Sequence, residues 1–283
     1  MDVSLYIPCY NTAAFLDKVI PAVMAQTYPI KEVLIIDDGS TDGTLEIAGR
    51  YINKTTYPLR IVRHGHNRGL SGARNTGFKE AHTEYVASLD GDCVPEPDWL
   101  EKLMRNFTDE KVAGVGGMLI ETAIYTVADK WRKAHMSQDW GATRTINPQF
   151  LFGHSNVFKA SAVKETGYYD ERFRTNAEDY HMSLALYKAG YTLIYEPQAV
   201  TRHLKTDTVK SVLTAFWRYG QWGFQPSLKN TVIRAVSHSL ACFRMLVSDM
   251  KNRNWPIMPI TLLSPLLFSY YDCKTWFRKA LNV

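Results

Sequence analysis

The chain has 283 residues, 46% of them hydrophobic and 12% aromatic, which is enough to bury a large core. Its net charge of +5 is unevenly distributed: residues 226–283 contain eight Lys and Arg against two Asp, whereas residues 1–225 contain 25 basic and 26 acidic side chains. This distribution excludes a globally basic nucleic-acid-binding protein, so no nucleic-acid partner is expected.

The first half of the chain alternates short apolar runs with helical patterns, which is typical of βα units around a mostly parallel sheet. We expect strands at residues 3–8, 33–36, 59–62 and 85–89, with helices between them. The helical pattern over residues 15–24 contains Pro21, which predicts a kink or a restart there. Acidic and turn residues follow the second and fourth strands, at the edge where open α/β sheets bind ligands.

The second half is less regular. Residues 112–117 form a short glycine-rich segment, residues 124–140 and 179–190 have helical patterns, and residues 193–195 are expected to form a strand. No internal repeat or low-complexity segment is visible. The sequence therefore predicts an α/β protein with its main ligand site in the first half.

Two carboxylates one residue apart, Asp90 and Asp92, follow the fourth expected strand, with Gly91 between them. Gly91 permits a tight turn that lets the backbone approach a ligand. Carboxylate oxygens suit Mn²⁺ or Mg²⁺, with phosphate oxygens completing the coordination. The same three residues would also suit an ordinary surface turn, because Asp-Gly is a common turn dipeptide.

Five motifs occur along the chain in a recognisable order. They are Ile7-Pro8-Cys9-Tyr10-Asn11, Asp37-Asp38-Gly39-Ser40-Thr41-Asp42, Asn67-Arg68-Gly69-Leu70-Ser71-Gly72-Ala73-Arg74-Asn75, Asp90-Gly91-Asp92 and Glu178-Asp179. Together they resemble the family-2 glycosyltransferases, over residues 3 to 205. The resemblance implies an α/β GT-A fold, in which a Rossmann-like, mostly parallel central sheet is flanked by helices, here with a C-terminal helical extension.

The resemblance also implies a division into domains. The catalytic domain would cover residues 1–225, with a nucleotide-sugar-binding half at 1–117 and an acceptor-binding half at 118–225. Residues 226–283 would form a basic, aromatic and amphipathic extension.

Individual site residues are implied in the same way. Asp179 matches the catalytic base, and Glu178 adjoins it. Asp92 matches the carboxylate that binds the metal, Mn²⁺ or Mg²⁺, with Asp90 and His203 as further metal contacts. Asp38 matches the residue that recognises the base of the donor nucleotide, and Arg74 matches a basic residue near the nucleotide. The complete set of nucleotide-sugar-binding positions is Pro8, Tyr10, Asn11, Asp37, Asp38, Arg74, Asp90 and Gly91.

The chemistry of sugar transfer requires two separate groups of carboxylates. Negative charge builds on the leaving diphosphate, and a divalent cation stabilises that charge where it develops. The acceptor hydroxyl loses a proton as it attacks the opposite face of the sugar, which requires a carboxylate base. We therefore expect an inverting glycosyltransferase with a nucleotide-diphosphate sugar as donor. The resemblance to the family favours UDP as the nucleotide of that donor. The expected acceptor is a hydroxyl group of a glycan or a lipid-linked saccharide.

Other interpretations remain open for these residues. Glu178 and Asp179 would also favour the positive end of a helix, and His203 after a strand would suit an ordinary hydrogen bond. A sugar-phosphate nucleotidyltransferase is disfavoured, because residues 8–12 lack a glycine-rich basic loop. A catalytically silent sugar- or nucleotide-binding module on the same fold is disfavoured by the intact carboxylates of both motifs.

The C-terminal extension combines apolar, aromatic and basic side chains. Apolar residues recur every three or four positions from 232 to 250, which predicts an amphipathic helix. Residues 254–271 carry no charge but contain three prolines, which are expected to break a helix, so we expect no single membrane span. The extension is expected either to pack on the catalytic domain or to lie on an anionic membrane surface.

The expected location follows from the cysteines and the N-terminus. The four cysteines are widely scattered and form no CxxC pair, which favours a reducing compartment. No signal-peptide pattern precedes the first expected strand. We therefore expect a cytoplasmic protein, with a peripheral position on the inner face of the cell membrane through the extension.

Overall fold

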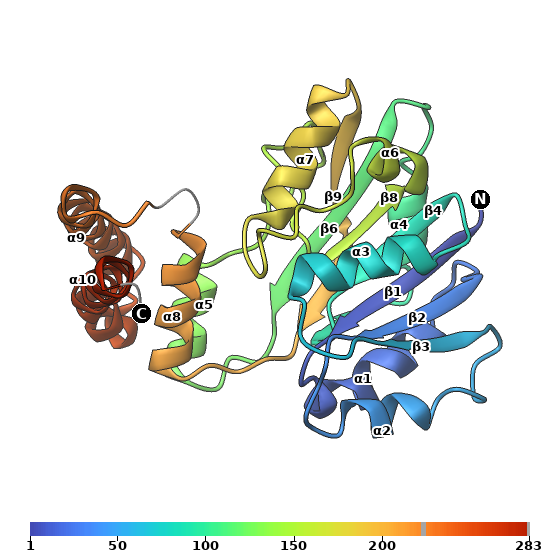
Figure 1. The fold of residues 1–283 in the computed structure, drawn as a ribbon, viewed down its shortest axis with the longest axis horizontal. Helices are drawn as coiled ribbons and strands as arrows, with labels where there is room; N and C mark the ends of the chain where they lie inside the picture. Colours follow the sequence, from blue (N-terminus) through green and yellow to red (C-terminus); the bar gives the residue numbers. More distant parts are fainter. Residues whose placement is uncertain (222–224, 282–283) are drawn as a thin grey trace. The chain divides into compact units, whose positions relative to one another are not determined.

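The computed structural model describes residues 1–221 and 225–281 (Figure 1). The chain divides into two compact units: Met1–Thr122 with Gln138–Leu204, and Ala123–Ser137 with Lys205–Val283. This division differs from the expected boundary at residue 225, because a short helical segment near residue 130 and the segment after Leu204 both group with the C-terminal helices.

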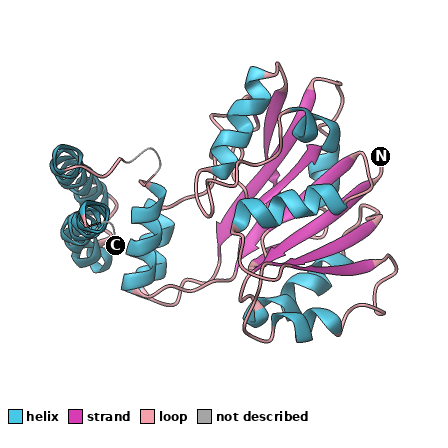
Figure 2. Cartoon of the chain, viewed as in Figure 1, coloured by secondary structure: helices cyan, strands magenta, loops and turns pink. Residues whose placement is uncertain are grey.

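The first unit is built on a sheet of nine strands within the described residues (Figure 2). The strands are β1 Val3–Cys9, β2 Glu32–Asp37, β3 Leu59–Arg63, β4 Tyr85–Leu89, β5 Cys93–Pro95, β6 Val112–Glu121, β7 Thr145–Ile146, β8 Ser155–Lys159 and β9 Thr192–His203. Their order is β3-β2-β1-β4-β8-β6-β9-β5, with β7 paired to β9. The first four strands are mutually parallel, and β8 joins β4 in the antiparallel sense. The α/β class and the Rossmann-like half are confirmed.

Helices cover both faces of this sheet. One core contains side chains from α1, α2 and α4, and a second core contains side chains from α3, α6 and α7. Along β1, Leu5 and Ile7 enter the first core and Tyr6 the second, because successive strand residues point to opposite faces. The helices are α1 Ala13–Met24, α2 Thr44–Gly49, α3 Leu70–Glu80, α4 Trp99–Met104, α6 Ala160–Glu165 and α7 Glu178–Lys188.

Two expectations about the first unit need correction. Helix α1 runs through Pro21 without a restart; proline has a helical φ and removes only one N–H donor, close to the end of this helix. The glycine-rich segment and the short strand expected at 193–195 belong to two long strands, β6 and β9, that pair in parallel.

The second unit is helical in its described residues. It contains α5 Val127–His135, α8 Val209–Tyr219, α9 Leu228–Lys251, the short 3₁₀ helix η1 Trp255–Ile257 and α10 Met258–Ala280. The expected break at the prolines is only partly correct. Pro256 lies in η1 and Pro259 in the first turn of α10, where proline is tolerated, and α10 continues through Pro265.

All four cysteines are free. No helix in the part of the chain that the structure describes is long and apolar enough to cross a membrane.

The contact between α3 and β1 gives a stability prediction. A Cβ atom added at Gly77 would overlap the buried ring of Tyr6. We expect Gly77→Ala to lower the free energy of unfolding by about 1–3 kcal/mol, measured by urea denaturation, because the packed interface cannot accept the extra methyl group. Gly49→Ala in α2 is the matched control, since nothing lies within 4 Å of the added atom. Equal midpoints for the two variants would contradict the predicted overlap.

Candidate active site

Three of the predicted motifs meet at one edge of the sheet. Since β1, β2 and β4 are parallel, their carboxyl ends lie on the same side. Cys9 pairs in register with Asp37, and the N–H of Asp38 donates to the carbonyl oxygen of Cys9 at 2.8 Å. A Cβ atom at Gly91 would lie 3.4 Å from the carbonyl oxygen of Pro8, so the turn after β4 touches the segment after β1.

Asn11 fastens the end of β1 to the loop after β2. Its backbone has a positive φ of 55°, a conformation that asparagine adopts more readily than most residues. Its side-chain oxygen accepts the N–H of Thr41 at 2.8 Å, and its own N–H donates to Ser40 Oγ at 3.0 Å. The preceding Tyr10 is 51% exposed and Asn11 is exposed as well, whereas Pro8 and Cys9 are buried, so Tyr10 and Asn11 are the residues of this segment that face solvent.

Asp37 is fully buried at the end of β2. Its Oδ1 accepts the N–H of Ser40 at 3.1 Å, and its Oδ2 lies 3.5 Å from Nε of Arg63. These contacts shape the loop after β2.

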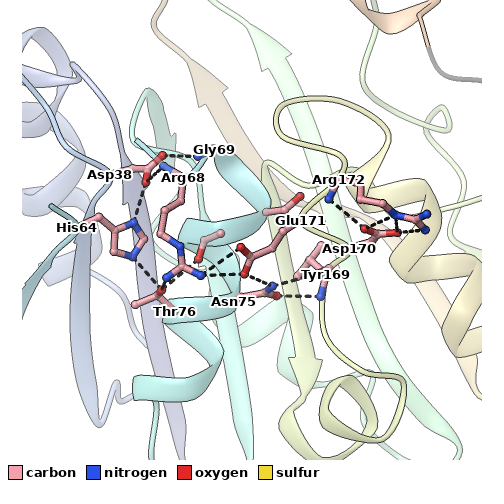
Figure 3. A network of polar contacts seen from close by, with 12 residues as sticks. Asp38, His64, Arg68, Gly69, Asn75, Thr76, Tyr169, Asp170, Glu171 and Arg172 are labelled. Carbon is pink, nitrogen blue, oxygen red and sulfur yellow. Dashed lines mark hydrogen bonds and ion pairs between the residues drawn. The ribbon is translucent and has the colours of Figure 1, made fainter. Parts of the chain in front are cut away.

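Asp38 holds the turn that precedes α3 (Figure 3). One of its oxygens, Oδ1, lies 2.7 Å from Nδ1 of His64 and accepts the N–H of Arg68 at 2.8 Å. The other, Oδ2, accepts the N–H of Gly69 at 2.8 Å. A nucleotide base bound here would therefore donate to the carboxylate lone pairs of Asp38 that these backbone and histidine contacts do not occupy.

The network in Figure 3 continues from this turn to the segment before α7. Nη2 of Arg68 donates to Oε1 of Glu171 at 2.9 Å. The side-chain amide of Asn75 donates to the carbonyl oxygen of Tyr169 at 2.9 Å and accepts its N–H at 2.8 Å. The sequence singled out residues 67–75 as a motif but gave no signal for their partners near residue 170. These bonds hold the segment that leads into α7 against α3.

Arg74 lies between the two acidic motifs and is 1% exposed. Its Nη2 is 3.2 Å from Oδ1 of Asp90 and 3.8 Å from Oε1 of Glu178. Its Nε and Nη1 have no hydrogen-bond partner among the described residues. A Cβ atom at Gly153 would overlap the guanidinium, so glycine leaves the space that Arg74 occupies. The structure thus joins both acidic motifs through one buried cation.

The carboxyl groups around Arg74 ionise less readily than surface carboxyls. Burial raises the pKa of Asp90 to about 6; the charge of Asp92 adds to this shift and Arg74 opposes it. Burial also raises the pKa of Glu178, with Arg74 opposing, and raises the pKa of Asp179 against Arg74 and backbone hydrogen bonds. Shifts of this kind are concentrated at functional sites.

The two carboxylates at the start of α7 differ in surroundings. Glu178 is buried beside Arg74, and its Oε2 has no hydrogen-bond partner in the described part of the chain. Asp179 is half-buried, and its Oδ2 accepts the N–H of Gly153 at 3.1 Å. Ala177, just before them, has φ 66°, which is strained for alanine and fixes the direction in which α7 begins. Of the pair, Asp179 is the carboxylate that a substrate could reach.

Asp92 faces a histidine that comes from the far end of β9. Cys93 pairs with His203 in the sheet, and Nε2 of His203 lies 3.5 Å from Oδ2 of Asp92. Nδ1 of the same ring lies 2.7 Å from Oε2 of Glu121. Burial disfavours the charged ring, but hydrogen bonds to Asp92 and Glu121 raise the pKa of His203 to about 9. Glu121 was not predicted, because its place depends on the β6–β9 register.

The donor set at Asp92 fits a cation that is shared with a phosphate ligand. No group of three or more His, Cys, Asp or Glu side chains in residues 1–221 and 225–281 is placed to hold a metal by itself. Asp92 and His203 could supply two ligands, and the contact of His203 with Glu121 is the carboxylate support that metal-binding histidines usually have. Mn²⁺ and Mg²⁺ are commonly completed by phosphate and water oxygens.

A family model and named relatives are similar to this chain in sequence. The model of the family "Glycosyl transferase family 2" matches residues 4–167. Poly-beta-1,6-N-acetyl-D-glucosamine synthase of Staphylococcus epidermidis is 29% identical over 279 residues, which cover 94% of this chain and 65% of that protein. The enzyme of the same name from Staphylococcus aureus is 30% identical over 240 residues, covering 81% of this chain and 56% of that protein. The chain thus spans less than two thirds of these relatives.

Solved structures share the fold at low sequence identity. The mannosyltransferase PcManGT from Pyrobaculum calidifontis, in complex with GDP-Man and Mn²⁺, has a TM-score of 0.61 at 19% identity and covers 95% of this chain and 87% of that one. S. aureus TarS in complex with UDP-GlcNAc has a TM-score of 0.57 at 19% identity, covering 77% and 65%. These similarities confirm the GT-A architecture expected from the sequence.

Proposed function

Since the chain belongs to glycosyl transferase family 2, we propose that it is an inverting enzyme that moves a sugar from a nucleotide-diphosphate donor to an acceptor hydroxyl group. The observation that carries this proposal is the meeting of two acidic motifs at Arg74, which lies 3.2 Å from Asp90 and 3.8 Å from Glu178. One motif serves the leaving diphosphate, and the other serves the attacking hydroxyl.

In this mechanism Asp179 is the base. Its carboxylate, oriented by the N–H of Gly153, takes the proton of the acceptor hydroxyl as the oxygen attacks the anomeric carbon. The hydroxyl approaches from the face opposite the diphosphate, so a single displacement inverts that carbon. Glu178 and Arg74 position the start of α7 relative to Asp90.

The diphosphate lies on the other side of the site. Asp92 and His203 would hold Mn²⁺ or Mg²⁺ there, with Asp90 in support, and the bound ion would stabilise the negative charge that develops on the leaving group. The Mn²⁺ in the PcManGT complex supports this part of the proposal. Tyr10 and Asp38, at the ends of β1 and β2, would bind the base.

The donor we favour is a UDP-sugar, with UDP-GlcNAc as the first to test. The relatives are named as N-acetylglucosamine polymer synthases, and the TarS complex contains UDP-GlcNAc. The PcManGT complex contains GDP-Man, so the shared fold alone does not select the base.

The acceptor we favour is a glycan or a lipid-linked saccharide. Trp140, Phe150 and Phe152 form a cluster of rings with centroid separations of 4.7–5.4 Å, next to the glycine that binds Asp179. Aromatic rings of this kind pack well against the apolar faces of sugars.

The four free cysteines support a reducing, cytoplasmic location, with the enzyme peripheral on the membrane when its acceptor is lipid-linked.

Product analysis tests the proposed function. The full chain is incubated with Mn²⁺, a panel of nucleotide sugars and saccharide acceptors, and the released nucleotide is identified. Release of a nucleoside diphosphate with formation of a longer saccharide is the expected result. Release of pyrophosphate from a nucleoside triphosphate and a sugar phosphate would instead indicate a nucleotidyltransferase. Ligand-induced thermal stabilisation without any product would indicate a silent binding module.

A further inference from the structure

Helix α9 presents its apolar stripe to solvent. Of the stripe predicted over residues 232–250, six side chains are 45–66% exposed and two, Leu246 and Val247, are half-buried. The exposed six are Val232, Ile233, Val236, Leu240, Phe243 and Met250, and Leu228, 60% exposed, precedes them. Soluble domains rarely expose contiguous apolar surface of this kind without a partner.

The opposite side of α9 is buried and polar. Asp272 of α10 is fully buried and accepts hydrogen bonds from Nε of Arg234 at 2.8 Å and Nε1 of Trp217 at 2.8 Å, and it pairs with Nε2 of His238 at 3.0 Å. Asp249 of α9, also fully buried, accepts from Thr261 Oγ1 at 2.8 Å. The two carboxylates of the hairpin are therefore paired inside, beside a few buried apolar side chains such as Ile260 and Phe268, while most of the apolar stripe of α9 lies outside.

Helix α10 repeats this arrangement. Thr261, Ser264 and Asp272 are buried, as are two apolar residues, Ile260 and Phe268. The exposed apolar and aromatic residues from η1 to the end of α10 are Trp255, Leu262, Leu263, Leu266, Tyr270, Phe277 and Leu281. Polar groups inside and apolar groups outside are typical of helices in a lipid environment.

The charge of this surface has one sign. Asp249 and Asp272 are the only acidic residues after residue 225, and both are fully buried. The exposed basic residues are Lys229, Arg244, Lys251, Arg253, Lys274, Arg278 and Lys279. A surface that combines exposed apolar groups with unopposed positive charge is complementary to anionic lipid headgroups.

The two helices run antiparallel, since Arg234 pairs with Asp272 and Cys242 contacts Thr261. Six of the seven exposed basic residues therefore lie near the two ends of the hairpin: Lys229, Lys274, Arg278 and Lys279 at one end, Lys251 and Arg253 at the other, with Arg244 within α9. We propose that α9 and α10 lie along the surface of an anionic bilayer, with the apolar stripes immersed among the headgroups and the basic residues bound to lipid phosphates. The occupant is thus a lipid surface, and the attachment lies in the bilayer interface.

Flotation of the full chain with lipid vesicles tests this proposal. We expect binding to vesicles that contain phosphatidylglycerol, weaker binding to pure phosphatidylcholine, and loss of the difference at high salt. The double variant Leu240→Gln with Phe243→Gln should weaken binding by roughly 100-fold, because two immersed side chains are lost without a change in charge.

A matched control separates immersion from a general effect of glutamine. Ala241→Gln with Ser248→Gln changes two exposed positions of α9 outside the stripe and should leave binding within about twofold. Equal binding by both double variants, or no flotation of the unaltered chain, would overturn the proposal. The proposal would also be overturned if the chain did not bind vesicles and instead formed a dimer that depends on Leu240 and Phe243. Donor turnover without vesicles should be the same in all variants, which keeps this outcome separate from the catalytic proposal.

Discussion

Asp92→Asn should lower the turnover of sugar transfer by about 10²–10³-fold, because it removes a charge at the position where the leaving diphosphate becomes more negative. Asparagine keeps the shape of the side chain near His203 but not its affinity for a divalent ion. A second readout does not depend on turnover: Mn²⁺ added with UDP should raise the thermal midpoint of the unaltered chain and have little effect on the variant.

The control for this experiment is Asp98→Asn at the start of α4. Asp98 is partly exposed and forms a surface ion pair, at 2.8 Å, with Lys102. Surface pairs contribute little, so turnover should stay within about twofold of the unaltered chain. Full turnover by Asp92→Asn, with the Mn²⁺ effect intact, would exclude Asp92 as the metal-binding carboxylate.

The parts of the fold that the sequence predicts are those set by local patterns. Strands β1, β2 and β4 are buried throughout and mainly apolar, and polar residues end or follow each of them, so their burial and the position of their carboxyl ends follow from the pattern alone. The meeting of the motifs at 37–38 and 90–92 follows in turn from the parallel arrangement of the sheet.

The partners of the site residues depend on contacts between distant segments, which no local pattern contains. Arg74 is buried because Gly153, far along the chain, leaves space for its guanidinium. Glu121 reaches His203 only through the register of β6 and β9, which includes two irregularities. Neither contact has a signature in the spacing of residues near it.

The orientation of α9 illustrates the same limit. Periodicity identified an apolar stripe, but it does not say whether a stripe faces inwards or outwards. In α9, Arg234 and His238 pair with the buried Asp272, so the side of the helix that carries them faces inwards. The apolar stripe on the other side therefore remains exposed. A single-sequence pattern taken alone favours burial of the apolar side, whereas most of the α9 stripe is exposed.

Asp179→Asn should lower turnover by about 10²–10⁴-fold while leaving donor binding nearly unchanged, because asparagine cannot accept the proton of the acceptor hydroxyl. Isothermal titration with the nucleotide and a steady-state assay at saturating donor separate the two effects. Asp170→Asn, nine residues earlier and bonded to the exposed Arg172 (Figure 3), is the matched control and should retain turnover within about twofold. Loss of nucleotide binding in Asp179→Asn would mean that Asp179 organises the donor site rather than acting as the base.

The pH dependence gives an independent test of the same residue. Burial raises the pKa of Asp179, and the base works only when it is deprotonated. Turnover should therefore be highest above this raised pKa and fall as the pH decreases through it, at a higher pH than an ordinary surface carboxyl would give. In Asp179→Asn the residual rate should lack this acidic limb. An acidic limb that persists unchanged in the variant would assign it to another group, with Glu178, whose pKa is also raised, as the first candidate.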